Sequence, residues 1–239
     1  MPAPIAVGFD FDHTLGIDNK LERTVALEML RSLALSKSIA YDGAAAELAI
    51  DEVLARSRSG AATIEAAIAG LFERFAPSGS ATMDTAQDFR DTVVARAPAH
   101  IEARPGAEAM LAELDALGIR YAILTNGWSP LQEEKARLFG FRGSVFVSER
   151  VNARKPAREA FDLLAKHFEL PPAQIYYVGD DPETDIAGAA AAGLTAVWYD
   201  WERRAYPAGI ARPAHTIADL AELPALLQGH VSGLAKLTE

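Results

Sequence analysis

The 239-residue sequence predicts an α/β protein, a doubly wound parallel sheet with an inserted helical block. From about residue 119 short apolar runs alternate with helical patterns, and strict alternation of strand and helix produces a parallel sheet covered on both faces. Residues 18–98 are instead Ala-rich with almost no β-branched runs, which favours helices. We therefore expect an α/β core domain formed by residues 1–15 and 100–239 and a helical domain at 16–99.

Buried strands of a parallel sheet read as continuous apolar runs. We expect strands at 119–125, 144–147, 174–179 and 195–199, and a central strand within 4–10. The helical stretches between them are 107–117, 129–139, 156–168 and 182–192. Gly118, Gly140 and Gly193 stand where three of these helices should end, and proline stands at the start of the last two. These elements describe a Rossmann-like core.

The helical block shows its clearest 3.6-residue spacing in the stretch with Ile64, Ile68, Leu71 and Phe72. Sequence breaks at 41–43, 59–60 and 76–79 divide the block into about four helices.

Composition excludes several classes of protein. The absence of cysteine excludes disulfides, thiolate metal sites and cysteine nucleophiles, and a reducing cytoplasm is the default expectation. The short apolar N-terminal run ends in aspartates rather than in a signal-peptide cleavage site, and no apolar run approaches the about 20 residues of a membrane helix. The net charge of −10 argues against nucleic acid or an anionic membrane as a partner, and leaves monomer and homodimer open.

Open α/β sheets bind ligands at the carboxyl ends of their strands, so the residues that follow each strand are the candidates for chemistry. The first strand is followed by Asp10 and Asp12, and the second ends in Thr125 with Asn126 after it. Lys155 comes shortly after the third strand. The fourth leads into Asp180, Asp181 and Asp185, the last two of which also suit the start of the helix at Pro182.

This set of side chains points to metal-assisted chemistry on a phosphoryl group. Asp10, Asp12 and Asp180 offer oxygen atoms as metal ligands, and the set includes no Cys or His ligand. Such a set suits Mg²⁺. The Thr125 hydroxyl, the backbone N–H groups after it and Lys155 would bind the phosphoryl oxygens. One carboxylate of the Asp10/Asp12 pair can attack phosphorus, and the other can protonate the leaving oxygen and then activate water.

The chain resembles the haloacid dehalogenase superfamily in four motifs, in the family's order, within residues 5 to about 200. The motifs are Asp10-Phe11-Asp12-His13-Thr14-Leu15, Thr125-Asn126-Gly127, Lys155-Pro156, and Gly179-Asp180-Asp181 through Asp185. The helical block after the first motif is similar to the family's C1 cap, a lid over the active site.

The resemblance implies a phosphoaspartyl mechanism. It makes Asp10 the nucleophile and Asp12 the general acid and base. It implies Mg²⁺ on the Asp10 side chain, the Asp12 backbone carbonyl and Asp180. Thr125, Asn126 and Lys155 would bind and neutralise the phosphoryl group. Either Asp181 or Asp185 would orient metal-bound water or Lys155 from behind. His13 replaces the glycine often found there, and we interpret it as a loop residue rather than a ligand.

The presence of Asp12 limits the reactions that the family resemblance allows. The dehalogenase members of the family lack this second aspartate, and the phosphonatase branch has alanine there. We therefore expect an Mg²⁺-dependent phosphatase for a small phosphorylated metabolite. A phosphomutase, or an inactive relative that binds a phosphorylated ligand or a partner protein, remains an alternative. The aromatic and basic segment 198–206 suits packing in the core better than a place at the pocket.

Overall fold

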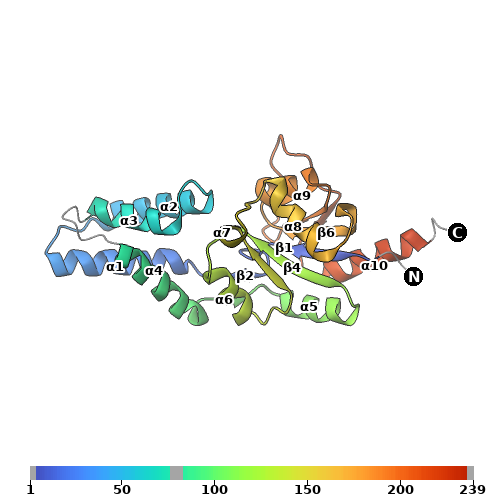
Figure 1. Ribbon diagram of the computed structural model, residues 1–239, viewed down its shortest axis with the longest axis horizontal. Helices are drawn as coiled ribbons and strands as arrows, with labels where there is room; N and C mark the ends of the chain where they lie inside the picture. The colour runs from blue at the N-terminus through green and yellow to red at the C-terminus, as the bar shows by residue number, and fades with distance from the viewer. Residues whose placement is uncertain (1–3, 76–82, 236–239) are drawn as a thin grey trace. The chain divides into compact units, whose positions relative to one another are not determined.

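The computed structural model describes residues 4–75 and 83–235, so the break expected at 76–79 lies outside the described residues. The chain forms two compact units (Figure 1). The first unit comprises Met1–Ile17, Glu102–Asn126 and Phe139–Glu239, and the second comprises Asp18–Ile101 and Gly127–Leu138. The predicted domain division, at residues 15/16 and 99/100, stays a prediction. It differs from these units chiefly in residues 127–138, which it places in the α/β domain.

The first unit is built on a parallel sheet with the strand order β5-β4-β1-β6-β7-β8. Its strands are β1 (Ala6–Phe9), β4 (Arg120–Thr125), β5 (Ser144–Val147), β6 (Ile175–Gly179), β7 (Thr195–Tyr199) and β8 (His215–Ile217). The five predicted strands are confirmed, and β1 lies between β4 and β6, as expected for a central strand. The edge strand β8 was not predicted.

Helices flank both faces of this sheet, which confirms the doubly wound α/β fold. They are α5 (Ala107–Ala116), α7 (Ser148–Val151), α8 (Arg158–Phe168), η2 (Pro172–Gln174), η3 (Pro182–Ala187), α9 (Gly188–Ala191) and α10 (Glu222–Ala235). Figure 1 shows α8 and α9 on one face of the sheet and α5 and α10 on the other. The face under α8 and α9 is packed with buried side chains of the strands and of Phe161, Leu164 and Ala189.

Two predicted helices differ from their expected form. The helix expected from Pro156 begins at Arg158, so the proline precedes it. The stretch after Pro182 starts as a wide π-helical turn, η3, before continuing as α9. The expected helix-ending glycines are confirmed, because Gly118, Gly140 and Gly193 have φ angles of +67°, +74° and +86°.

The second unit consists of helices. They are α1 (Leu21–Lys37), α2 (Gly43–Arg58), α3 (Ile64–Phe75), α4 (Met83–Arg96), η1 (Ala97–Ala99) and α6 (Leu131–Leu138). The prediction of four helices in the inserted block is confirmed by α1 to α4. Their buried faces meet in a core that also takes up Trp128 and Leu131, which explains why the α6 segment belongs to this unit.

A two-stranded antiparallel ribbon stands where the chain leaves the first unit and returns to it. It pairs β2 (Gly16–Ile17) with β3 (Glu102–Ala103), and Ile17 is the register partner of Glu102. The two ends of the inserted block therefore meet at neighbouring positions.

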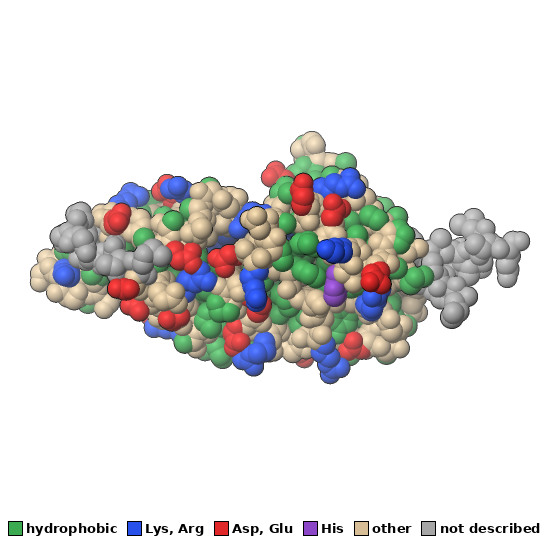
Figure 2. Space-filling model, viewed as in Figure 1, with side chains coloured by type: hydrophobic (Ala, Val, Ile, Leu, Met, Phe, Trp, Pro, Cys, Tyr) green, Lys and Arg blue, Asp and Glu red, His purple; other side chains and the backbone are tan. Residues whose placement is uncertain are grey.

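On the face drawn in Figure 2, acidic and basic side chains are interspersed over the described residues. Among the described residues, the helices lack the combination of length and apolarity needed to cross a membrane.

Candidate active site

The chain turns sharply after β1. The backbone N–H of Asp10 still donates to the Val178 carbonyl of β6, at 2.9 Å. The carbonyl of Phe11 then accepts from the N–H groups of Thr14, Leu15 and Gly16, at 3.2, 2.9 and 3.0 Å, which curls the chain into a tight loop. A straight strand would present Asp10 and Asp12 on the same side. The chain departs from this straight geometry directly after Asp10.

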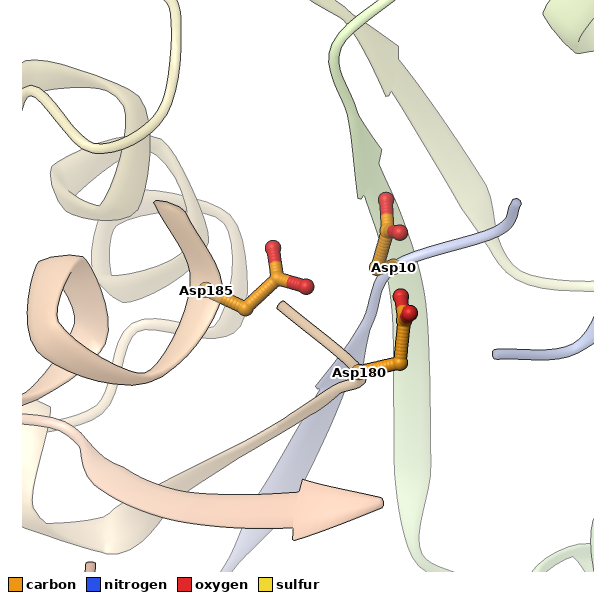
Figure 3. A group of neighbouring side chains, drawn as sticks. All are labelled: Asp10, Asp180 and Asp185. Carbon is orange, nitrogen blue, oxygen red and sulfur yellow. The ribbon is translucent and has the colours of Figure 1, made fainter. Parts of the chain in front are cut away.

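Three carboxylates converge at the carboxyl end of the sheet. Oxygens of Asp10, Asp180 and Asp185 all lie within 4.8 Å of one another. Figure 3 shows that Asp10 comes from the end of β1, Asp180 from the end of β6, and Asp185 from the η3 turn, pointing toward the other two. The Asp12 carboxylate is not among these three groups, and the expected role of the Asp12 backbone carbonyl as an Mg²⁺ ligand stays a prediction.

Lys155 lies against this group. Its side chain is 3 % exposed, and its Nζ donates to Asp10 Oδ1 at 2.7 Å, to Asp185 Oδ1 at 2.7 Å and to Tyr177 Oη at 2.9 Å. An ammonium group has three N–H donors, so all three have a protein partner. The structure therefore brings together Asp10, Lys155 and Asp185 from three separate motifs.

Tyr177 belongs to this cluster, and the sequence analysis missed it. It is fully buried on β6, and its hydroxyl donates to the Leu124 carbonyl of β4 at 2.8 Å while it accepts from Lys155. A tyrosine in an apolar strand reads as core, and the one available signal was its hydroxyl, which needs a partner when it is buried.

The segments of Thr125 and Lys155 are joined through Asn126. The Asn126 side chain donates from Nδ2 to the Lys155 carbonyl at 2.8 Å and accepts at Oδ1 from the Lys155 backbone N–H at 2.9 Å. Its amide is therefore engaged with protein, and its backbone N–H is the group that could serve a ligand. Thr125 is the last residue of β4 and is 1 % exposed.

Asp181 and Asp185 have different partners, although both lie at the start of η3. Asp181 caps the helix, since its Oδ1 accepts from the backbone N–H groups of Glu183 and Thr184 at 2.9 and 2.7 Å. Asp185 binds Lys155 through Oδ1 and accepts from the Asp181 backbone N–H through Oδ2, at 3.1 Å. The capping interpretation thus applies to Asp181, and Asp185 is the one that faces the site.

Asp180 is held from the side of β7. Its backbone carbonyl accepts from Trp198 Nε1 and from Arg204 Nη2, each at 3.1 Å, and Arg204 also lies 3.8 Å from Asp180 Oδ2. Trp198 is 3 % exposed and belongs to the core. The packing interpretation of segment 198–206 is therefore right for Trp198, which also supports the site.

Burial and mutual repulsion favour the protonated forms of the carboxylates. Burial raises the pKa of Asp10 to about 7, the attraction of Lys155 opposes the rise, and the charge of Asp185 adds to it. Burial, with the charge of Asp10, raises the pKa of Asp180 to about 7, and burial also raises the pKa of Asp185.

Lys155 and Tyr177 respond to the same surroundings. Burial acts to lower the pKa of Lys155, but the charges of Asp10 and Asp185 raise it well above its ordinary value. Burial raises the pKa of the Tyr177 hydroxyl well above its usual range, so it stays neutral. One lysine thus faces two carboxylates directly, with Asp180 as a third nearby.

The donor set fits a hard divalent cation. All three converging groups are carboxylate oxygens from Asp10, Asp180 and Asp185, and oxygen ligands are what Mg²⁺ prefers. A divalent cation would also offset the repulsion that raises their pKa values.

The fold and the site together define a doubly wound α/β protein with an acidic, lysine-paired site at the carboxyl edge of its sheet. A model of one family, described as haloacid dehalogenase-like hydrolase, matches residues 6–193. This chain belongs to that family of hydrolases, as its four motifs suggested.

Curated relatives and solved structures agree with this assignment. Over 130 residues the chain is 35 % identical to the pyrimidine 5'-nucleotidase YjjG of Escherichia coli, covering 53 % of this chain and 57 % of the relative. Over 99 residues it is 40 % identical to the phosphoserine phosphatase of Thermus thermophilus, covering 40 % of each. The chain spans about half the length of the curated relatives it matches.

The solved structures share the fold over nearly the full chain. The 2-haloacid dehalogenase of Pseudomonas syringae pv. Tomato superposes with a TM-score of 0.73 at 21 % identity, over 95 % of this chain and 99 % of that one. At this identity the likeness concerns the fold alone.

Proposed function

We propose that this protein is an Mg²⁺-dependent phosphomonoester hydrolase that cleaves a small phosphorylated metabolite through a phosphoaspartyl intermediate. The observation that carries the proposal is the contact of Lys155 with both Asp10 and Asp185, beside Asp180, at the carboxyl edge of the sheet. A buried lysine paired with the residue predicted as nucleophile supplies the positive charge that an incoming phosphoryl group needs.

Each residue has a distinct part. Asp10 and Asp180, with the backbone carbonyl of Asp12, would hold Mg²⁺, which when bound neutralises phosphoryl charge and orients the group for attack. Lys155 supplies a second positive charge, and Asp185 holds Lys155 through the 2.7 Å hydrogen bond. The Thr125 hydroxyl and the N–H groups that follow it would bind phosphoryl oxygens.

The chemistry proceeds in two displacements. A carboxylate oxygen of Asp10 attacks phosphorus, the bond from phosphorus to the ester oxygen breaks, and Asp12 donates its proton to the leaving alcohol. Water, deprotonated by Asp12, then attacks the phosphorus of phosphorylated Asp10. The aspartyl oxygen leaves, inorganic phosphate is released, and Asp12 regains its proton.

The presence of Asp12 favours phosphate-ester cleavage over dehalogenation, although dehalogenases share the fold. A halide leaves as an anion and needs no proton, whereas an alkoxide leaving group does. The names of the curated relatives, a nucleotidase and a phosphatase, support the same choice.

The test is phosphate release from a panel of sugar phosphates, nucleotides and phosphoglycolate, with Mg²⁺ and with EDTA. We expect turnover with Mg²⁺ only, and its loss in Asp10→Asn. Asp12→Ala should lose most turnover but still bind vanadate. Asp162→Asn is the matched control, since this carboxylate of the same unit is half exposed on α8 and pairs with Arg158.

Three outcomes would contradict the proposal. They are an unchanged rate in Asp10→Asn, the release of chloride from a 2-chloro acid in place of phosphate release, and isomerisation of a sugar phosphate faster than net phosphate release.

A further inference from the structure

Tyr177 is held in one place by its neighbours. It lies opposite Gly8 in the register of β1 and β6, and a Cβ atom at Gly8 would lie 2.8 Å from the Tyr177 ring. Only glycine at position 8 leaves room for this ring. Phe161 packs against it edge-on, with ring centroids 5.1 Å apart and an interplanar angle of 84°. The ring therefore places its hydroxyl at a fixed point.

The direction of the Tyr177 hydroxyl is also fixed. A phenol has one hydrogen to donate, and Tyr177 donates it to the Leu124 carbonyl at 2.8 Å. Toward Lys155, 2.9 Å away, the hydroxyl can then act only as an acceptor. Tyr177 thus joins two elements, because Leu124 directly precedes Thr125 on β4 and Lys155 follows β5.

We propose that Tyr177 is a positioning residue for phosphoryl transfer, which holds the ammonium group of Lys155 at a set distance from the end of β4, where Thr125 lies. The inference rests on the proposed function. Of the three acceptors of Lys155, Asp10 is the group predicted to become phosphorylated, whereas Tyr177 and Asp185 are unchanged by the reaction. Lys155 can keep these two bonds and direct its third N–H to a phosphoryl oxygen.

A purely structural role is the competing interpretation. The Leu124 carbonyl is buried, and the Tyr177 hydroxyl satisfies it. Loss of the hydroxyl would then lower stability alone, with no specific effect on the group that contacts Lys155. The two interpretations differ in whether the effect of Tyr177 depends on Lys155.

The experiment compares Tyr177→Phe with Tyr121→Phe. Tyr121 is a matched control, because it lies on β4 of the same sheet, is 8 % exposed and donates its hydroxyl to Asp115 at 2.8 Å, away from Lys155. With p-nitrophenyl phosphate as substrate, we expect Tyr177→Phe to lower kcat at least about tenfold with little change in KM, since misplacing a catalytic group acts on the transition state. Tyr121→Phe should keep the wild-type kcat.

A second readout does not depend on turnover. Vanadate affinity is measured by thermal shift in wild type, Tyr177→Phe, Lys155→Met and the double variant, all checked for folding by circular dichroism. We expect Tyr177→Phe to weaken vanadate binding in the wild-type background and to have no further effect once Lys155 is replaced, which is the signature of a residue that acts through another.

The inference is overturned if Tyr177→Phe keeps a kcat within twofold of wild type. An equal loss of vanadate affinity with and without Lys155 would also overturn it. A wild-type protein that hydrolyses no phosphomonoester contradicts the proposed function itself, so the two failures are distinguishable.

Discussion

The side-chain amide of Asn126 pairs with both the N–H and the carbonyl of the Lys155 backbone, at 2.9 and 2.8 Å. This pair ties the loop that carries Lys155 to the end of β4. It is separate from the hydrogen bonds of the Lys155 ammonium group, so the lysine is held at both ends of its side chain.

Asn126→Ala should therefore affect stability and turnover together. It leaves two backbone groups of Lys155 without their partner, which costs about 1–3 kcal/mol of unfolding free energy when such groups are buried. Urea unfolding and phosphate release measure the two effects. Asn126→Asp keeps one acceptor but faces the Lys155 carbonyl with an anion, and we expect it to be no better than alanine. Wild-type turnover in both variants would contradict this account.

Gly179→Ala should disrupt the site without touching a reacting group. A Cβ atom at this position would lie 2.5 Å from Cβ and Cγ of Asp185, so the Asp185 side chain must move, and with it the acceptor it offers to Lys155. Overpacking of this kind costs about 1–3 kcal/mol. We expect lower stability in urea and a fall in kcat. Gly70→Ala is the control, since a Cβ there meets nothing within 4 Å. Its kcat should equal that of wild type.

The stability of the metal-free protein should depend on pH in a specific direction. Asp10 and Asp180 each have a pKa of about 7 in the folded chain, against an ordinary value of 3.8. A carboxyl group with a raised folded pKa contributes stability that is fully present below its unfolded pKa and is lost as the pH rises through the folded value. In EDTA, the unfolding free energy should fall between about pH 4 and pH 7 and should then level off. One such group accounts for a fall of at most about 4 kcal/mol.

The matched variant is Asp180→Asn, which resembles the protonated acid and should flatten this dependence. Mg²⁺ should raise the midpoint of thermal unfolding more at pH 8 than at pH 5, because protons compete with the cation for the same oxygens. Urea titrations at several pH values measure the first effect, and thermal melts with and without Mg²⁺ measure the second. The assignment would be refuted if the metal-free stability of wild type, taken relative to that of Asp180→Asn, rose from pH 5 to pH 7.

His13 occupies a backbone conformation that glycine adopts most easily. Its φ is +64°, in the left-handed region, where His and Asn are tolerated but β-branched residues are not. His13→Gly and His13→Asn should leave stability nearly unchanged, whereas His13→Val should lower it by about 1–2 kcal/mol. Urea unfolding of the three variants gives the order. Equal stability of His13→Val and wild type would contradict it.

The sequence predicted most of the fold because its elements carry local signals. Buried parallel strands are continuous apolar runs, as in 119–125, and helices end on glycines such as Gly118. The strand β8 has only three residues, and of these only Ile217 is buried. No apolar run in the sequence therefore predicts this strand. The α6 segment could not be assigned to its unit, because its helical pattern does not say which core Trp128 and Leu131 join.

The sequence predicted which types of residue form the candidate site and at which strand ends they lie. Asp10, Lys155 and Asp180 each follow a strand, and parallel topology alone brings such positions together. The partners of each group were not predictable in this way. Asp181 and Asp185 both suit the start of a helix. Only the tertiary structure shows that Asp181 caps the helix and that Asp185 accepts a hydrogen bond from Lys155. Tyr177 reads as core, because a sequence does not show where a hydroxyl points.

The β2–β3 ribbon and the α6 segment together determine which residues must be exchanged to make a chimera of this protein with a relative. Since Ile17 and Glu102 are register partners, an insert cut at this ribbon has adjacent ends and could be exchanged as a cassette without breaking the parallel sheet. A cassette of residues 18–101 alone would leave Trp128 and Leu131 behind, and with them part of its own core. A chimera that retains folding must therefore transfer residues 127–138 as well, so the transferable module is discontinuous in the chain.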